Sequence, residues 1–173
     1  FEAAATRHAV ATLVVTPREH DTLTTIAPGC DIRVVPNGVD LDALRPSEPP
    51  AQAPNVVFCG VMNYAPNERA ALWLGRDIWP LVRREIPTAT LTIVGSQPTR
   101  AVLDLASDAQ GIAVTGAVAD VKPFLWRAAV AAAPIRTARG IQNKVLEAVA
   151  AGLPTVVTPN ILESLPETVA SAC

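Results

Sequence analysis

The chain has 173 residues, of which 50% are hydrophobic and 17% are charged, and its formal net charge is −2. This length is sufficient for a domain with a buried core, and the composition excludes an intrinsically disordered chain. The charge balance gives no indication of a nucleic-acid partner, and no apolar run reaches the length of a membrane span.

The N-terminal part alternates between helical and strand patterns. We expect helices at 1–9 and 17–27 and strands at 11–16 and 31–36. The second helix begins with a proline, which suits a first helical turn. An Asn-Gly turn follows, and residues 45–54 are proline-rich without periodicity, which indicates a linker or an extended segment.

From residue 55 onward, short apolar runs alternate regularly with helical patterns. Strands are predicted at 55–60, 89–95, 111–116, 130–134 and 154–159. Helices are predicted between them at 67–87, 99–107, 121–128 and 141–151, and Pro80 is expected to kink or divide the first. This order is typical of an α/β fold with a Rossmann-like, doubly wound parallel sheet, and the continuously apolar strands fit a sheet covered on both faces.

Ligands of such sheets bind beyond the carboxyl ends of the strands. Three of the five predicted strand ends carry a glycine, namely Gly60, Gly95 and Gly116, and glycine lets a ligand approach the backbone closely. Glycine after a strand is also common turn chemistry, which is the preferred interpretation for any one of them alone.

The loop 134–140 leads into the helix that is expected to open at Ile141. A helix N-terminus offers free N–H groups and a partial positive charge, so it attracts phosphate. Arg136, Arg139 and Lys144 add full positive charges nearby. This stretch is therefore a candidate site for a phosphorylated ligand.

Glu147 lies on about the same face of this helix as Asn143, one turn further along. A carboxylate at this place could accept two hydrogen bonds from the vicinal hydroxyls of a ribose. The alternative is that Lys144 and Glu147 form an exposed ion pair and the arginines are solvated, and the spacing alone does not decide between the two.

Other motifs have simpler explanations. The D-x-D sequence at 40–42 could hold a divalent metal with a diphosphate, but Asp40 is more simply a helix N-cap. In the stretch 60–67, Asn63 and Tyr64 could face the cleft, or Asn67 could only cap the next helix. Neither the cysteines nor the histidines have metal-ligand spacing, so no metal is expected.

Five ordered segments together resemble a known family: VVPNGVD (34–40), FCGVMNYAPN (58–67), LTIVGSQP (91–98), VTGAVADV (114–121) and GIQNKVLEAVAAGLPTVVTP (140–159). They closely resemble the C-terminal half of GT-B glycosyltransferases of the family-4 (group 1) retaining group. Their sequences are most similar to those of bacterial sugar transferases associated with exopolysaccharide assembly, and the resemblance covers nearly the whole chain.

The resemblance implies a domain arrangement in which two Rossmann-like domains face each other across a cleft. Residues 1–36 would be the tail of the N-terminal, acceptor-binding domain, and residues 37–54 the interdomain linker. Residues 55–173 would be the nucleotide-sugar-binding domain, incomplete at its C-terminus. On this basis the chain is expected to be a fragment of a longer enzyme and inactive alone.

The resemblance also assigns roles to individual residues. Glu147 matches the second glutamate of the family's E-x7-E motif, which implies a ribose contact. The position of the motif's first glutamate, which usually contacts the donor sugar in the family, is occupied here by Arg139. This chain therefore departs from the family pattern at that contact. Gly60 would line the diphosphate, and Val118 would bind the base through its backbone. The expected catalytic residues are Lys144 and Arg139, and the expected donor-binding residues are Gly60, Asn63, Gly95, Val118, Gly140, Ile141 and Glu147.

The implied activity is transfer of a sugar, with retention, from a nucleotide-diphosphate donor to an acceptor hydroxyl in exopolysaccharide or glycoconjugate biosynthesis. Expected partners are the nucleotide sugar and a saccharide or lipid-linked acceptor, with no nucleic acid, no cofactor and no required metal. The expected location is the cytoplasm or, through peripheral association by the N-terminal domain, the inner face of the membrane. Two alternatives stay open: a GT-B nucleotide-sugar epimerase and a non-catalytic nucleotide-binding module.

Overall fold

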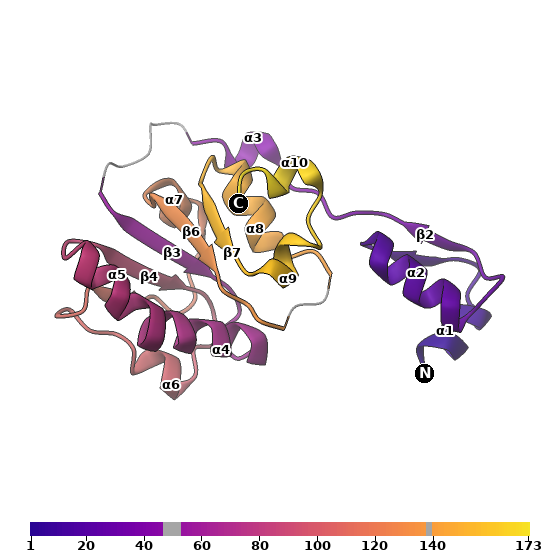
Figure 1. Cartoon of the computed structure of the whole chain (residues 1–173), viewed down its shortest axis with the longest axis horizontal. Coiled ribbons are helices and arrows are strands. Elements are labelled where there is room, and N and C mark those ends of the chain that lie inside the picture. Colours follow the sequence, from indigo (N-terminus) through magenta and orange to yellow (C-terminus); the bar gives the residue numbers. More distant parts are fainter. Residues whose placement is uncertain (47–52, 138–139) are drawn as a thin grey trace.

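The computed structural model describes residues 1–46, 53–137 and 140–173. Its main body is a five-stranded sheet in the spatial order β5-β4-β3-β6-β7, and every adjacent pair of strands is parallel (Figure 1). The strands are β3 (Asn55–Cys59), β4 (Thr90–Val94), β5 (Ile112–Val114), β6 (Val130–Ala133) and β7 (Thr155–Val157). The chain reverses direction across the sheet between β3 and β6, so the predicted Rossmann-like doubly wound sheet is confirmed.

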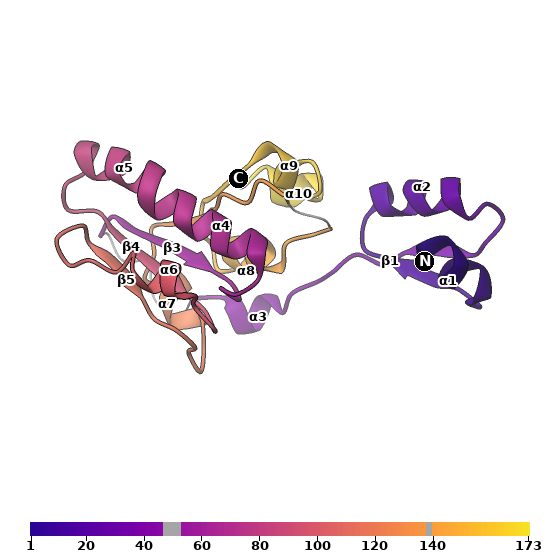
Figure 2. The ribbon, with the colours of Figure 1, turned by 90° about the horizontal axis from the view of Figure 1, so that it is seen from below.

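Helices cover both faces of this sheet (Figure 2). One face carries α4 (Ala65–Trp73), the π-helical turn η1 (Leu74–Ile78) and α5 (Trp79–Glu85), and the other carries α3 (Leu41–Leu44), α7 (Lys122–Trp126) and α8 (Asn143–Ala150). Val57 and Phe58 are both buried but belong to different core clusters, as alternation along a two-sided strand requires. Three short helices complete the domain: α6 (Arg100–Leu103), α9 (Pro159–Leu162) and α10 (Glu167–Ala170).

The long helix predicted at 67–87 is divided, as expected, but by a π-helical turn. The helix begins at Ala65, two residues earlier than predicted, and η1 separates α4 from α5. Pro80 lies in the first turn of α5, immediately after η1. Because proline has no N–H group, the wider turn before it absorbs the missing helical hydrogen bond.

The segment before the sheet is partly built into the domain core. Asp40 is the N-cap of α3, and its Oδ1 accepts a hydrogen bond of 2.9 Å from the Ala43 N–H, which confirms the capping interpretation. Leu44 is buried, and its carbonyl accepts a 2.8 Å hydrogen bond from Trp126 Nε1. The predicted division into 1–36, 37–54 and 55–173 stays a prediction.

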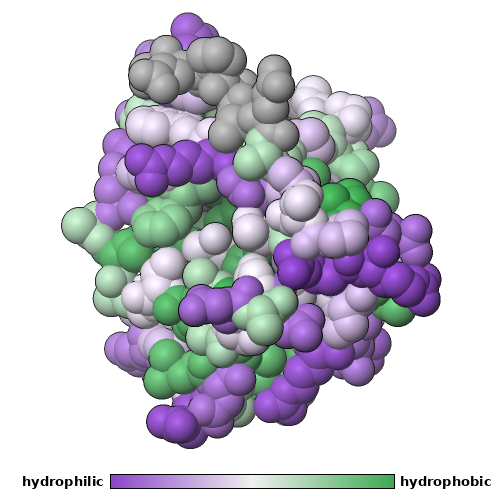
Figure 3. All heavy atoms as spheres, turned by 90° about the vertical axis from the view of Figure 1, so that its left-hand side faces the viewer, coloured by the Kyte–Doolittle hydropathy of each residue, from purple (hydrophilic) through white to green (hydrophobic). Residues whose placement is uncertain are grey.

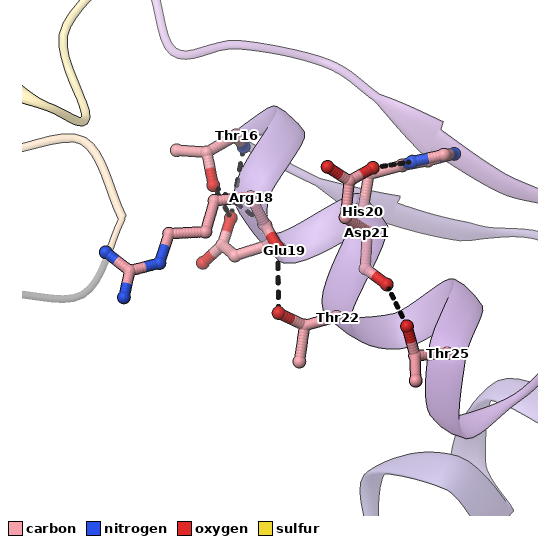
Figure 4. A network of polar contacts seen from close by, with 7 residues as sticks. All are labelled: Thr16, Arg18, Glu19, His20, Asp21, Thr22 and Thr25. Atoms are coloured by element: carbon pink, nitrogen blue, oxygen red, sulfur yellow. Dashed lines mark hydrogen bonds and ion pairs between the residues drawn. The ribbon is translucent and has the colours of Figure 1, made fainter.

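The N-terminal residues form a small lobe beside the sheet domain. It contains α1 (Glu2–His8), β1 (Thr12–Val14), α2 (Pro17–Ile26) and β2 (Ile32–Val34), and its two strands are parallel. Helix α2 begins with a capping box, in which the Thr16 side chain accepts from the Glu19 N–H and the Glu19 carboxylate accepts from the Thr16 N–H (Figure 4).

The two ends of the sheet face in opposite directions. Figure 3 shows the end that faces away from the small lobe, where hydrophilic side chains are interspersed with small hydrophobic areas. The carboxyl ends of the strands lie toward the opposite end, on the side of the lobe (Figure 1). In the described part of the chain, no helix has the length and hydrophobicity needed to cross a membrane.

Candidate functional site at the carboxyl ends of the strands

Three glycines bring the ends of neighbouring strands together. The Gly60 N–H donates to Val94 O at 3.0 Å, and the Gly95 N–H donates to Gly116 O at 3.2 Å. A Cβ atom at Gly95 would lie only 1.6 Å from Gly60 O, so no larger residue fits there. Packing of the strand ends thus accounts for Gly95, and turn chemistry for Gly116, which has a φ of +70°.

Gly60 leaves space for two side chains that arrive from opposite faces of the sheet. A Cβ atom at this position would lie 2.8 Å from Asn67 Nδ2 and 3.0 Å from Lys144 Nζ. Asn67 comes from the first turn of α4, and Lys144 is the second residue of α8. The end of β3 is therefore the place where the two helices present polar groups to each other.

The Lys144 side chain reaches over this end of β3. Its ammonium group donates a hydrogen bond of 2.5 Å to Asn67 Oδ1 and lies 5.1 Å from the centroid of the Phe58 ring. Burial lowers the pKa of Lys144 to about 8, against the opposing influence of the nearby Cys59 and Glu147. The ammonium group forms no ion pair with the carboxylates that the structure describes, although the charge of Glu147 acts on it from a greater distance.

Glu147 follows Lys144 by one helical turn and is half-buried. Burial raises the pKa of its carboxyl group, and the positive charge of Lys144 opposes that shift. Within the described residues its carboxylate has neither a hydrogen-bond donor nor an ion-pair partner. The alternative of an exposed Lys144–Glu147 ion pair is therefore wrong, because both side chains are half-buried and they do not pair.

Helix α8 begins at Asn143, two residues later than predicted. Ile141 is buried and Gln142 is an extended N-cap residue, while Gly140 has a φ of +67°, so the chain turns inward before the helix can start. The first helical turn therefore starts at Asn143, and among the described residues the N–H groups of Asn143 and Lys144 have no backbone acceptor, whereas the Val145 N–H donates to Gln142 O at 2.9 Å. Ligand contacts by Gly140 and Ile141 stay predictions.

The other predicted cations are placed differently. The Arg136 guanidinium stacks over the Trp73 ring of α4, 3.8 Å from its centroid, and the Arg136 carbonyl accepts a 2.8 Å hydrogen bond from Asn160. This stacking directs the Arg136 side chain toward α4. The assignment of Arg139 lies outside the described residues.

The loops after β3 and β4 are joined by an amide pair. Asn63 Nδ2 donates to Gln97 Oε1, and Gln97 adopts a φ of +53°. Tyr64 is exposed, and the expectation that Asn63 and Tyr64 face a cleft stays a prediction. Val118 lies in the loop after β5 with its side chain packed against the core cluster that contains Val57, and its predicted backbone contact with a base stays a prediction.

Asn67 is the residue of the candidate site whose position differs most from the prediction. It is the third residue of α4 and not its N-cap, because the helix already starts at Ala65, so the capping interpretation is wrong. Its side chain is 6% exposed, and it contacts Lys144, which is 77 positions away in the sequence. No local spacing could have indicated this pair.

A small cavity lies beside the aliphatic part of the site. A cavity of about 10 Å³, close to the volume needed for one water molecule, lies under Lys144 between β3, β6 and α8. Nowhere in the described ranges do three or more potential metal-ligating side chains come together.

The sequence pattern described as Glycosyl transferases group 1 matches residues 53–172. No match was found among curated proteins. A point mutant of S. aureus TarM, in complex with Fondaparinux, alpha-GlcNAc-glycerol and UDP, has a similar structure with a TM-score of 0.75 at 12% identity. The superposed region covers 90% of this chain and 31% of that protein.

Two further structures are similar. Sucrose-phosphate synthase from Thermosynechococcus elongatus has a TM-score of 0.69 at 20% identity, covering 91% of this chain and 43% of that one. The pneumococcal O-GlcNAc transferase GtfA, in complex with UDP and GlcNAc, has a TM-score of 0.68 at 14% identity, covering 91% and 32%. At these identities the likeness shows the fold, that of GT-B glycosyltransferases, and this chain spans less than half of each of these structures.

Proposed function

The chain belongs to the glycosyl transferases of group 1, and we propose that it forms the nucleotide-sugar-binding part of an enzyme that transfers a sugar to an acceptor hydroxyl. The proposed donor is a nucleotide-diphosphate sugar, and the proposed reaction retains the anomeric configuration. The similarity to glycosyltransferases crystallised with UDP supports this choice of donor. Biosynthesis of exopolysaccharide or another glycoconjugate is the proposed setting, in the cytoplasm or at the inner face of the membrane.

The half-buried ammonium group of Lys144, which has no ion-pair partner among the described residues, is the observation that carries this proposal. In the reaction the bond between the anomeric carbon and the diphosphate oxygen breaks, and a bond to the acceptor oxygen forms. Negative charge then accumulates on the leaving diphosphate, whose oxygen takes up the proton that the acceptor hydroxyl loses. Lys144 and the N–H groups at the start of α8 would stabilise that charge, and no metal ion would be required.

Glu147 provides the second part of the proposed site. Its carboxylate, which has no hydrogen-bond donor among the described residues, lies one helical turn beyond Lys144, so it would accept hydrogen bonds from the two ribose hydroxyls of the bound nucleotide. Gly60 and Gly95 would then line the diphosphate, and the backbone of Val118 would contact the base. A saccharide or lipid-linked acceptor would approach from the side of the small lobe.

The ribose contact can be tested directly by ligand-induced thermal stabilisation. We expect at least one of UDP, GDP and ADP to raise the melting temperature of the chain, and the 2′-deoxy form of that nucleotide to bind more weakly. Glu147→Gln keeps the size of the side chain but removes its charge. It should weaken binding of the ribonucleotide by about tenfold, as expected for the loss of charge-assisted hydrogen bonds.

The preference for ribose over deoxyribose distinguishes this role from a general effect on stability. In Glu147→Gln the preference should largely disappear, whereas Glu163→Gln, on the exposed end of α9, should leave it unchanged. The proposal is refuted if none of the three nucleotides binds to the unmodified chain. An unaltered ribose preference in Glu147→Gln would remove the ribose assignment alone.

A further inference from the structure

Asn67 holds Lys144 in place through both ends of its amide group. Its Oδ1 accepts the 2.5 Å hydrogen bond from Lys144 Nζ, and its Nδ2 donates to Val61 O at 3.0 Å. Because the side chain is 6% exposed and begins on the first turn of α4, it has little freedom to turn away. The bond to Val61 also fixes which end of the amide faces the ammonium group, since a carbonyl can only accept.

The chemistry of this partner matters as much as its position. A carboxylate at the same place would form an ion pair with Lys144 and cancel its charge, whereas a neutral amide orients the ammonium group and leaves the charge available. Gly60 leaves room for the ammonium group because it has no side chain: a Cβ atom there would lie 3.0 Å from Lys144 Nζ. The lysine side chain is therefore held near one position before any anion arrives, which lowers the entropic cost of binding.

We propose that Asn67 is the positioning residue for Lys144, holding its ammonium group over the end of β3 as a free cation for the donor diphosphate. This inference rests on the proposed function, because it names how the site prepares its charge for that ligand. It assigns Asn67 no contact with the reacting atoms. The role requires an uncharged hydrogen-bond acceptor at position 67, so the isosteric change from asparagine to aspartate is the informative perturbation.

The experiment compares Asn67→Asp with Asn55→Asp. Asn55 is a matched control, because its Nδ2 also donates to a backbone carbonyl, Arg127 O, and its Oδ1 also accepts from a side chain, Thr90 Oγ1. It lies at the opposite end of β3, so both variants change the net charge equally but only one touches Lys144. Binding of UDP, GDP and ADP is measured by calorimetry at several values between about pH 6.5 and 9.5.

We expect Asn67→Asp to bind the preferred nucleoside diphosphate about tenfold more weakly at neutral pH, because the new carboxylate pairs with Lys144 and repels the phosphates. The pH at which affinity declines should also move upward, since a neighbouring carboxylate favours the charged form of lysine. Asn55→Asp should change neither quantity. A purely structural role for Asn67 would lower the melting temperature without moving the pH profile.

A second pair of variants keeps the test decisive if Asn67→Asp does not fold. Asn67→Ser is smaller and cannot reach Lys144, so it should weaken nucleotide binding, and the same substitution in a Lys144→Met background should have no further effect. Equal affinity and an identical pH profile in the Asn67 variants and the unmodified chain would overturn the inference alone. Failure of all three nucleotides to bind the unmodified chain would instead refute the proposed function and this inference with it.

Discussion

Replacing Gly95 with alanine tests whether the ends of β3 and β4 are packed as closely as the structure places them. The new Cβ atom would lie 1.6 Å from Gly60 O and 2.7 Å from the Gly60 carbonyl carbon, whereas non-bonded heavy atoms need about 3.5 Å. Both neighbours are backbone atoms, so no side chain can rotate away and the strand ends must separate. That movement stretches the bonds from Gly60 N–H to Val94 O and from Met62 N–H to Ser96 O, which are 3.0 and 2.8 Å long.

The expected destabilisation follows from these contacts. Losing two backbone hydrogen bonds lowers the free energy of unfolding by about 1–3 kcal/mol. The φ of +153° at Gly95 adds about 1–3 kcal/mol for any residue with a side chain. We therefore expect Gly95→Ala to lower the free energy of unfolding by about 2–6 kcal/mol, a large part of the total for a domain of this kind.

Urea unfolding followed by tryptophan fluorescence measures this effect against two matched substitutions. Gly116→Ala has a φ of +70° but no described atom within 4 Å of the new Cβ, so only the backbone conformation should contribute, by about 1–2 kcal/mol. Gly38→Ala meets no described atom within 4 Å and requires no positive φ, so it should be nearly neutral. A loss in Gly95→Ala no larger than that in Gly116→Ala would refute the close packing of the strand ends.

Two further predictions concern the titrating groups beside the site. Because the pKa of Lys144 falls from 10.5 to about 8 on folding, the unfolded chain binds more protons between these values, and this residue's contribution to stability should rise with pH there while nucleoside diphosphate affinity falls. Lys144→Met should remove both trends, and unchanged trends would contradict the assignment. Burial raises the pKa of the Cys59 thiol to about 11, so in the folded chain iodoacetamide should modify it at least about tenfold more slowly than the exposed Cys173. Peptide mapping measures both rates, and equal rates before unfolding would show that Cys59 is accessible.

The sheet could be predicted from the sequence because its strands are continuous apolar runs bounded by glycine or proline. Residues 89–95 were expected as a strand and β4 spans Thr90–Val94, a difference confined to the ends. The starts of helices were harder, since they depend on tertiary packing. Burial of Ile141 delays α8 to Asn143, and the π-helical turn before Pro80 divides a helix that periodicity alone shows only as a long pattern.

The candidate site could be predicted only in part, because a local pattern shows the spacing of residues along a helix but not the contacts between distant segments. Helical spacing correctly placed Lys144 and Glu147 near each other on α8, but it could not show that they remain unpaired or what they face instead. The stacking of Arg136 on Trp73 and the bond between Asn67 and Lys144 join distant segments. Side-chain partners of this kind are decided by which strands are neighbours, and no local pattern encodes them.

The strand order explains why a lysine of α8 can act at the end of β3. The loop after β3, from Val61 to Tyr64, contains no cation. Strand β6 is the neighbour of β3 in the sheet although β4 and β5 come between them in the chain. Because the elements after both strands start at the same edge, α4 and α8 begin side by side across the point where the order reverses. A charge required there can therefore come from either helix, and in this chain α8 supplies the charge while α4 supplies the neutral side chain that holds it.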